Sequence, residues 1–179
     1  MSDEEAMEAL SKGNLEKAAI LFERYQQRMY NFFVKMSFDR ELSQDLAQNL
    51  FLRLIRYRGS FVAGMPFRPW LYQMARNLLN DHYSQQKMRF SDFTDLEAIG
   101  REAAEMLEEA GQAEQEKALQ KALSLLEAEH REILVLSKFQ KLKYHEIARI
   151  MQCTEGSVKV KVHRAIKKLR GLYFMIESQ

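Results

Sequence analysis

Residues 144–158 read Tyr144-His145-Glu146-Ile147-Ala148-Arg149-Ile150-Met151-Gln152-Cys153-Thr154-Glu155-Gly156-Ser157-Val158. Apolar or small residues recur at the i, i+3, i+4, i+7 spacing of one helical face, at Tyr144, Ile147, Ala148 and Met151. Small Ala148 would let a second helix approach closely, and Thr154 can cap that helix by accepting a bond from an early backbone N–H. A short helix, a tight turn and a capped basic helix are the parts of a helix-turn-helix.

The helix after the turn, expected from 155 to about 174, has a basic outward face. At 100° per residue its buried side collects Val158, Val162, Ala165, Ile166 and Leu169. The opposite side presents Ser157, Val160, Arg164, Lys167 and Lys168, with Lys161 and His163 on its flanks. An outward Val160 could meet a thymine methyl group, and Arg164 could read a guanine or bind a phosphate. We therefore favour DNA binding over the alternative, a helical hairpin with a basic face.

Charge alternates in blocks along the chain. Residues 53–89 carry a net charge of +6 and residues 138–170 one of +8, whereas residues 1–16 and 92–117 carry −4 and −7. Two basic blocks separated by an acidic one indicate two surfaces that meet a polyanion, although solvated helix faces would produce similar runs. The acidic segment 92–117 is predicted to be a linker between two domains.

Helical spacing of apolar residues continues through most of the chain. Only 7 Gly and 2 Pro occur, which argues against many-turned β architectures. We expect helices over 15–37, from about Arg40 (after an Asp39 cap) to Tyr57, from Phe67 to about Lys87, and over 118–138, 144–151 and 155–174, with a loop at 58–65. The predicted fold is all-α: two small helical bundles, at 1–91 and 118–179, joined by the acidic linker.

The helix from Phe67 carries a second candidate surface. With Phe67, Trp70, Leu71, Met74 and Leu78 inward, the outward stripe is Tyr72, Gln73, Arg76, Asn80, Tyr83 and Lys87. Aromatic rings interleaved with amides and cations suit single-stranded nucleic acid, because rings stack on bases and cations hold phosphates. The alternative is a surface helix whose tyrosines lie flat on their neighbours.

The helix around residues 45–55 is apolar on two sides. One face is marked by Leu42, Leu46, Leu50 and Tyr57, and another by Phe51, Leu52 and Ile55. A helix of this kind is either central in a bundle or covered by another protein. The pattern alone leaves both interpretations open.

Residue types that carry catalysis or bind metals form no familiar pattern. His145, Cys153 and His163 lie near the turn, but their spacing fits no zinc motif. Without a phosphate-binding glycine loop or a nucleophile elbow, we predict no catalytic residue, no metal and no cofactor. Cys153 has no cysteine partner in the chain, and the acidic start Met1–Glu5 is unlike a secretory signal. We expect a cytoplasmic protein without membrane insertion.

Taken in order, these segments resemble a bacterial sigma factor of the extracytoplasmic-function group. The first half is similar to sigma region two at residues 21–25, at Asp45-Leu46-Ala47-Gln48-Asn49-Leu50-Phe51-Leu52-Arg53-Leu54, and at residues 66–77, which begin Pro66-Phe67-Arg68-Pro69-Trp70-Leu71. The second half is similar to sigma region four at residues 126–139, 144–148, 154–159 and 163–165. The resemblance extends over about residues 19–90 and 119–173.

The resemblance implies roles for three surfaces. The helix Asp45–Ile55 would dock on the clamp helices of the RNA polymerase β′ subunit, through Asp45, Gln48, Phe51, Leu52 and Ile55. The loop 58–65 and the helix from Pro66 would open the minus-ten promoter element and hold a flipped base, through Arg68, Tyr72, Gln73, Arg76, Asn77, Asn80, Tyr83 and Lys87. Residues 155–168 would read the minus-thirty-five element, through Glu155, Ser157, Lys159, Val160, Lys161, His163, Arg164 and Lys167.

The implied partners are core RNA polymerase, contacted at its β′ clamp helices and β flap, promoter DNA, and an anti-sigma protein that holds the factor inactive. The competing hypothesis is a stand-alone helix-turn-helix regulator whose first half senses a signal or dimerises. The aromatic and basic helix 67–87 and its proline-bounded start argue against that hypothesis.

Overall fold

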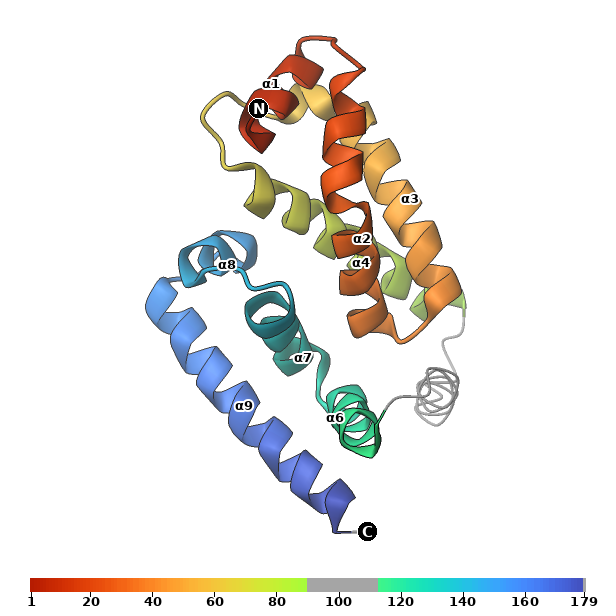
Figure 1. Cartoon of the computed structure of the whole chain (residues 1–179), viewed down its shortest axis with the longest axis vertical. Helices are drawn as coiled ribbons and strands as arrows, with labels where there is room; N and C mark the ends of the chain where they lie inside the picture. The colour runs from red at the N-terminus through yellow and green to blue at the C-terminus, as the bar shows by residue number, and fades with distance from the viewer. Residues whose placement is uncertain (90–112, 179) are drawn as a thin grey trace. The chain divides into compact units, whose positions relative to one another are not determined.

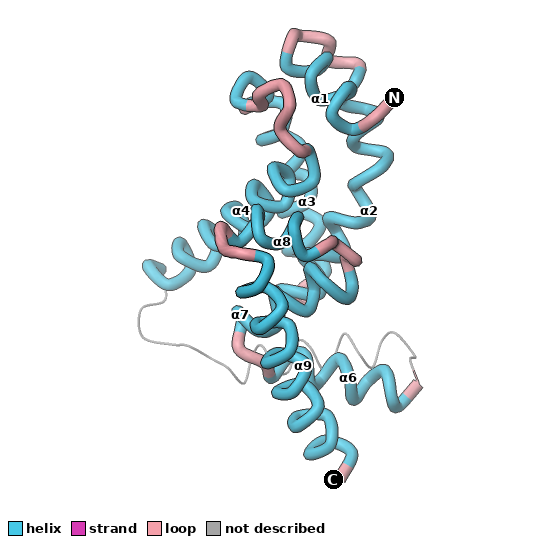
Figure 2. Tube along the Cα trace, turned by 90° about the vertical axis from the view of Figure 1, so that its left-hand side faces the viewer, coloured by secondary structure: helices cyan, strands magenta, loops and turns pink. Residues whose placement is uncertain are grey.

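The computed structural model describes residues 1–89 and 113–178, and for residues 87–89 it describes the backbone alone. Within these ranges every regular element is a helix (Figure 1, Figure 2), which confirms the predicted all-α class. The chain divides into two compact units, which are described separately. Most of the predicted linker 92–117 lies outside the described residues.

The first unit comprises Met1–Phe33 and Arg40–Arg89. Its elements are α1 (Asp3–Ser11), most of α2 (Lys17–Ser37), α3 (Arg40–Arg56), the 3-10 turn η1 (Arg58–Ser60) and α4 (Phe67–Arg89). Aromatic rings pack edge to face where these helices meet. Phe22 of α2 contacts Phe51 of α3 at a centroid distance of 5.0 Å, and Phe32 of α2 contacts Tyr72 of α4 at 5.8 Å.

The first helix, α1, is an element that the apolar spacing does not predict. It begins with a capping box, in which the Ser2 hydroxyl accepts a bond from the Glu5 N–H (3.1 Å) and the Glu5 carboxylate accepts one from the Ser2 N–H (2.7 Å). The helix buries Ala6, Met7 and Leu10. The Ser-x-x-Glu spacing at residues 2–5 was the sequence signal for this helix.

The second unit comprises Val34–Asp39 and, among the described residues, 113–178. Its helices are α6 (Glu114–Leu125), α7 (Ala128–Leu134), the π-helical turn η2 (Val135–Phe139), α8 (Tyr144–Met151) and α9 (Glu155–Glu177). The long α9 packs against α6, α7 and α8 (Figure 1). The predicted helices 144–151 and 155–174 are confirmed, and α9 extends a little further.

The predicted helix 118–138 is wrong as a single element, because the chain breaks between α6 and α7. The Arg131 side chain binds the carbonyl oxygens exposed at the end of α6: its Nε donates to Leu123 (3.0 Å), and its Nη2 donates to Ser124 (3.1 Å) and Leu126 (2.9 Å). A guanidinium that satisfies terminal carbonyls stabilises a helix end. At its other end α6 begins at Glu114, inside the stretch predicted as linker.

Candidate functional site

The predicted helix-turn-helix is formed by α8, a three-residue turn and α9. Gln152 adopts a left-handed conformation (φ 54°, ψ 50°), and the Cys153 N–H donates to the Ala148 carbonyl at 3.0 Å, which closes α8. The Thr154 hydroxyl then accepts a bond from the Ser157 N–H at 3.1 Å and caps α9. Ala148 is buried, as predicted for the close approach of the two helices.

The outward side of α9 is basic, as predicted. Val158, Val162 and Ala165 are buried, whereas Ile166 and Leu169 are only half-buried. The reading face, as we name it, consists of the exposed residues Lys159, Val160, His163, Arg164 and Lys167. Glu155 is also exposed, and Ser157 and Lys161 are half-buried beside it. Val160 exposes 47% of its surface among charged neighbours, an arrangement that suits contact with a base edge in the major groove.

Two lysines of α9 are paired with glutamates at the start of α7. Lys161 Nζ lies 4.0 Å from a Glu129 carboxylate oxygen, and Lys168 Nζ lies 3.9 Å from one of Glu127. Ion pairs at a solvated surface contribute little, about 0–1 kcal/mol. Both ammonium groups can therefore exchange these partners for phosphate at small cost.

The outward side of α4 differs from the prediction at one residue. Tyr72 is 0% exposed, because its ring packs edge to face on Phe32 of α2. The buried side of α4 therefore extends over Tyr72, Ala75 and Leu79. These residues follow the i, i+3, i+7 spacing of one helical face, which was the sequence signal that Tyr72 belongs to the buried side. Tyr72 cannot stack on a nucleic-acid base in this conformation.

The remaining predicted residues of α4 share one side of the helix. The strand face, as we name it, consists of Gln73, Arg76, Asn77, Asn80 and Tyr83, of which Gln73 and Arg76 are half-buried and the others exposed. Arg68 is half-buried near the start of the helix, and the side chain of Lys87 lies outside the described residues. Trp70 and Met74, predicted to point inward, are also only half-buried.

The loop between η1 and α4 makes a tight exposed turn. The Met65 N–H donates to the Val62 carbonyl at 3.0 Å, and Gly64 has a φ of 90°, which fits the third position of a type II turn. Phe61, by contrast, is buried, and its ring packs edge to face on Trp70 at 5.3 Å. The loop therefore has a fixed base and a projecting tip.

The outward side of α3 also differs from the prediction at one residue. Phe51 is only 8% exposed, because it packs against Phe22 of α2 and belongs to the core. Leu52 is 64% exposed between the exposed polar residues Asp45, Gln48 and Asn49, and Ile55 is half-buried. The helix thus leaves one large apolar side chain without cover within this unit.

A shallow apolar groove runs between α2 and α3. It is lined by Ala18, Ala19, Phe22, Phe51, Leu54 and Ile55. Phe22 exposes 44% of its surface there, and sequence reasoning missed it because the apolar pattern of α2 places it with the core residues. We name the docking face from these observations: Phe22, Asp45, Gln48, Leu52 and Ile55.

Neither a metal cluster nor a membrane span is found in the part of the chain that the structure describes. No three His, Cys, Asp or Glu side chains in residues 1–86 and 113–178 gather as metal ligands would. None of the described helices combines the length and hydropathy that crossing a bilayer requires.

Two regions of the sigma-70 family match this chain. Sigma-70 region 2 matches residues 21–89, which contain the docking and strand faces, and Sigma-70, region 4 matches residues 116–169, which contain the reading face. The first helix, α1, precedes both matches.

Individual relatives match over most of the chain. The RNA polymerase sigma factor CarQ of Myxococcus xanthus is 30% identical over 97% of this chain and 98% of CarQ. The ECF RNA polymerase sigma factor SigM of Bacillus subtilis is 30% identical over 86% of this chain and 93% of SigM. The same fold occurs in the solved structure of the sigma factor RpoE with the anti-sigma factor NepR from Bartonella quintana (TM-score 0.64, 21% identity, 86% of this chain and 94% of RpoE).

Proposed function

We propose, since this chain belongs to the extracytoplasmic-function (ECF) group of sigma-70-like RNA polymerase sigma factors, that its three exposed faces divide the steps of promoter recognition between them. The chain directs RNA polymerase to promoters. Its family is one of transcription initiation factors, and we propose that the chain itself has no catalytic activity.

The reading face of α9 is proposed to bind the minus-thirty-five element in the major groove. The guanidinium of Arg164 can form two parallel bonds to guanine, and the exposed Val160 can contact a thymine methyl group. Lys159 and Lys167 carry charge for the phosphates, which supply much of the affinity but no sequence information. The Thr154 cap fixes the start of the helix from which these side chains project.

The strand face of α4 and the turn at 62–65 are proposed to hold the melted minus-ten strand. Asn77 and Asn80 offer amides that can bond an unpaired base edge, Arg76 offers a cation for phosphate, and Tyr83 offers a ring for stacking. Flipping a base costs a few kcal/mol of stacking and pairing, so the protein must offer contacts that exist only after melting. We propose that the exposed turn before α4 receives the flipped nucleotide.

The docking face is proposed to bind core RNA polymerase. Leu52, Ile55 and Phe22 supply an apolar centre, and Asp45 and Gln48 supply a polar rim, which is the usual composition of a protein interface. The partner implied by the family resemblance is the pair of clamp helices of the β′ subunit, and for the second unit the β flap. A partner there would cover the one large apolar side chain that α3 leaves exposed.

An anti-sigma factor is a further proposed partner. The solved RpoE structure, whose fold this chain shares, contains the anti-sigma factor NepR. A protein that covered the docking face would compete with core polymerase for the same residues. A regulator of this kind would keep the factor inactive without unfolding it.

The observation that carries the proposal for promoter opening is the row of amide, guanidinium and phenol side chains along one side of α4, of which Asn77, Asn80 and Tyr83 are exposed. The test uses holoenzyme reconstituted from core polymerase and this chain. The DNA is a promoter that this holoenzyme selects from a random library. Asn80→Ala and Arg76→Ala should each deplete open complex on duplex promoter by about one to two orders of magnitude, since each removes a contact of roughly 1–3 kcal/mol. On a promoter with the minus-ten region already melted, the loss should be smaller.

The matched control is Gln85→Ala, which removes an exposed amide from the same helix at about 140° around the axis from Asn80. It should open the duplex promoter at the wild-type rate. Wild-type opening by both strand-face variants would contradict the assignment. The matches to both sigma-70 regions, and to CarQ along almost its whole length, favour a sigma factor over the competing hypothesis of a stand-alone helix-turn-helix regulator.

A further inference from the structure

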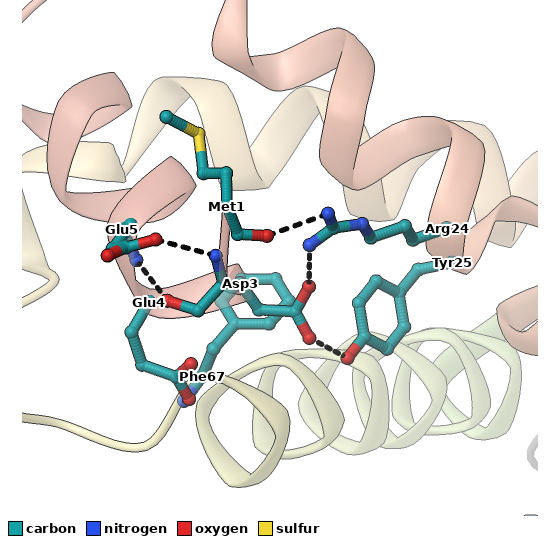
Figure 3. Close-up of polar contacts among 8 residues, drawn as sticks. Met1, Asp3, Glu4, Glu5, Arg24, Tyr25 and Phe67 are labelled. Carbon is teal, nitrogen blue, oxygen red and sulfur yellow. Dashed lines mark hydrogen bonds and ion pairs between the residues drawn. The ribbon is translucent and has the colours of Figure 1, made fainter.

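The first helix, α1, touches both ends of the loop that receives the promoter strand. It packs against η1, which precedes the loop 61–66, and against the start of α4, which follows it. It lies outside the segment that matches Sigma-70 region 2, which begins at residue 21. Its polar contacts are drawn in Figure 3.

Glu4 of α1 caps the start of α4 from a distant point in the sequence. Its Oε1 accepts a bond from the Phe67 N–H at 3.0 Å. The first turn of a helix leaves four N–H groups without partners inside the helix, but here Pro66 and Pro69 have no N–H to offer. Glu4 therefore satisfies one of the two donors that remain, and its negative charge is favourable at the positive end of the helix dipole.

Asp3, the residue before Glu4, fixes α1 to α2. Its carboxylate accepts bonds from Arg24 Nη1, at 2.8 Å, and from the Tyr25 hydroxyl (Figure 3). Arg24 also donates to the Met1 carbonyl at 2.8 Å. The ring of the same Tyr25 packs edge to face on Phe67 at 5.3 Å. Phe67 is thus held at its backbone by α1 and at its ring by α2.

Aromatic contacts connect Phe67 to the loop 61–66. Phe61, the buried anchor of the loop, lies 6.4 Å from Phe67 and 5.3 Å from Trp70 between ring centroids. The exposed turn at 62–65 follows Phe61 directly. A shift of the first turn of α4 would therefore move the base of the loop.

We propose that Glu4 is a positioning residue for promoter opening. By fixing the first N–H of α4, it sets the place of Phe67, of Phe61 and so of the turn that receives the melted strand. The inference rests on the proposed function of the strand face and the 62–65 turn. It assigns to α1 a part in strand capture without any contact between α1 and DNA.

The test measures the binding of a single-stranded DNA oligonucleotide, carrying the minus-ten sequence of the selected promoter, to holoenzyme. Glu4→Ala should weaken this binding roughly fivefold, which corresponds to about 1 kcal/mol, the usual effect of losing a helix cap. Glu4→Gln should retain most of the affinity, because its amide oxygen can still accept the Phe67 N–H. The control is Glu8→Ala, which removes the same charge from α1 one turn further on and should bind like wild type.

Each outcome separates this inference from the proposed function. Wild-type strand binding by Glu4→Ala would overturn the inference and leave the strand face standing. If Glu4→Ala weakened core-polymerase binding as much as strand binding and also lowered the melting temperature, Glu4 would be a general stabilising residue. That result would also overturn the inference. If wild-type holoenzyme failed to bind the oligonucleotide, the proposed function of this surface would fall, and the inference with it.

Discussion

Replacing Leu52 with alanine tests whether the docking face binds core polymerase. Full burial of a leucine side chain contributes about 1.5–3 kcal/mol. Because 64% of Leu52 is exposed in the chain alone, about two thirds of that free energy, roughly 1–2 kcal/mol, remains available to a partner. Leu52→Ala should therefore weaken core binding about 5- to 30-fold. Leu52→Asp should weaken it further, since it would bring a carboxylate into an apolar contact.

The same substitution should leave the fold almost unchanged. Surface substitutions away from caps and buried networks usually alter the free energy of unfolding by less than about 0.5 kcal/mol. Affinity is measured by titrating a fluorescently labelled chain with core polymerase, and stability by thermal melting followed by circular dichroism. The two measurements together distinguish a lost contact from a damaged fold.

The matched control is Leu50→Ala, on the same helix but 0% exposed. It should cost about 2–5 kcal/mol of stability, and the folded fraction should bind core polymerase with near wild-type affinity. Wild-type core binding by Leu52→Ala would refute the docking face. A loss of stability as large as that of Leu50→Ala would instead show that Leu52 packs inside the bundle.

Two further predictions concern the reading face and the contact of Tyr25, in α2, with Asp3, in α1. Arg164→Ala should cost about 1–3 kcal/mol of DNA-binding free energy, and only at the selected minus-thirty-five site. Lys167→Ala should weaken binding to all sequences alike and reduce by about one the slope of log affinity against log salt concentration. If each variant lost the same affinity at selected and scrambled sites, neither residue would read sequence. Burial and the Asp3 carboxylate raise the pKa of Tyr25, so the folded chain keeps this phenol protonated at a pH where the unfolded chain ionises it. Stability from Tyr25 is therefore complete below about pH 10 and is lost as the pH rises above it. The stability difference between wild type and Tyr25→Phe should shrink in urea unfolding above pH 10, and a constant difference up to pH 11 would contradict this.

The helix-turn-helix could be predicted because its determinants are close in sequence. The Thr154 cap and the closing bond from Cys153 to Ala148 join residues three and five positions apart. The apolar face of α8 and the basic face of α9 are likewise visible from spacing alone. Caps, closing bonds and helical faces of this kind can be predicted without knowing which helices lie nearby.

Residues at the margins of helical faces could not be placed in this way. Tyr72 and Phe51 were both assigned to outward surfaces, and both are buried by aromatic residues of α2, Phe32 and Phe22. A helical projection says which residues share a side, but the packing of the neighbouring helix decides how wide the buried side is. An amphipathic aromatic residue at such a margin fits either environment.

The contacts that hold the start of α4, and with it the loop 61–66, are non-local as well. The bond from Phe67 to Glu4 joins residues 63 positions apart, and no spacing rule connects an acidic N-terminal segment with a proline-bounded helix start. The charge of residues 1–16 could be read from the sequence as an acidic block, but its use at the dipole of α4 could not. Variants of the helix-turn-helix should therefore act where they are made, whereas variants of α1 should act on DNA that α1 does not touch.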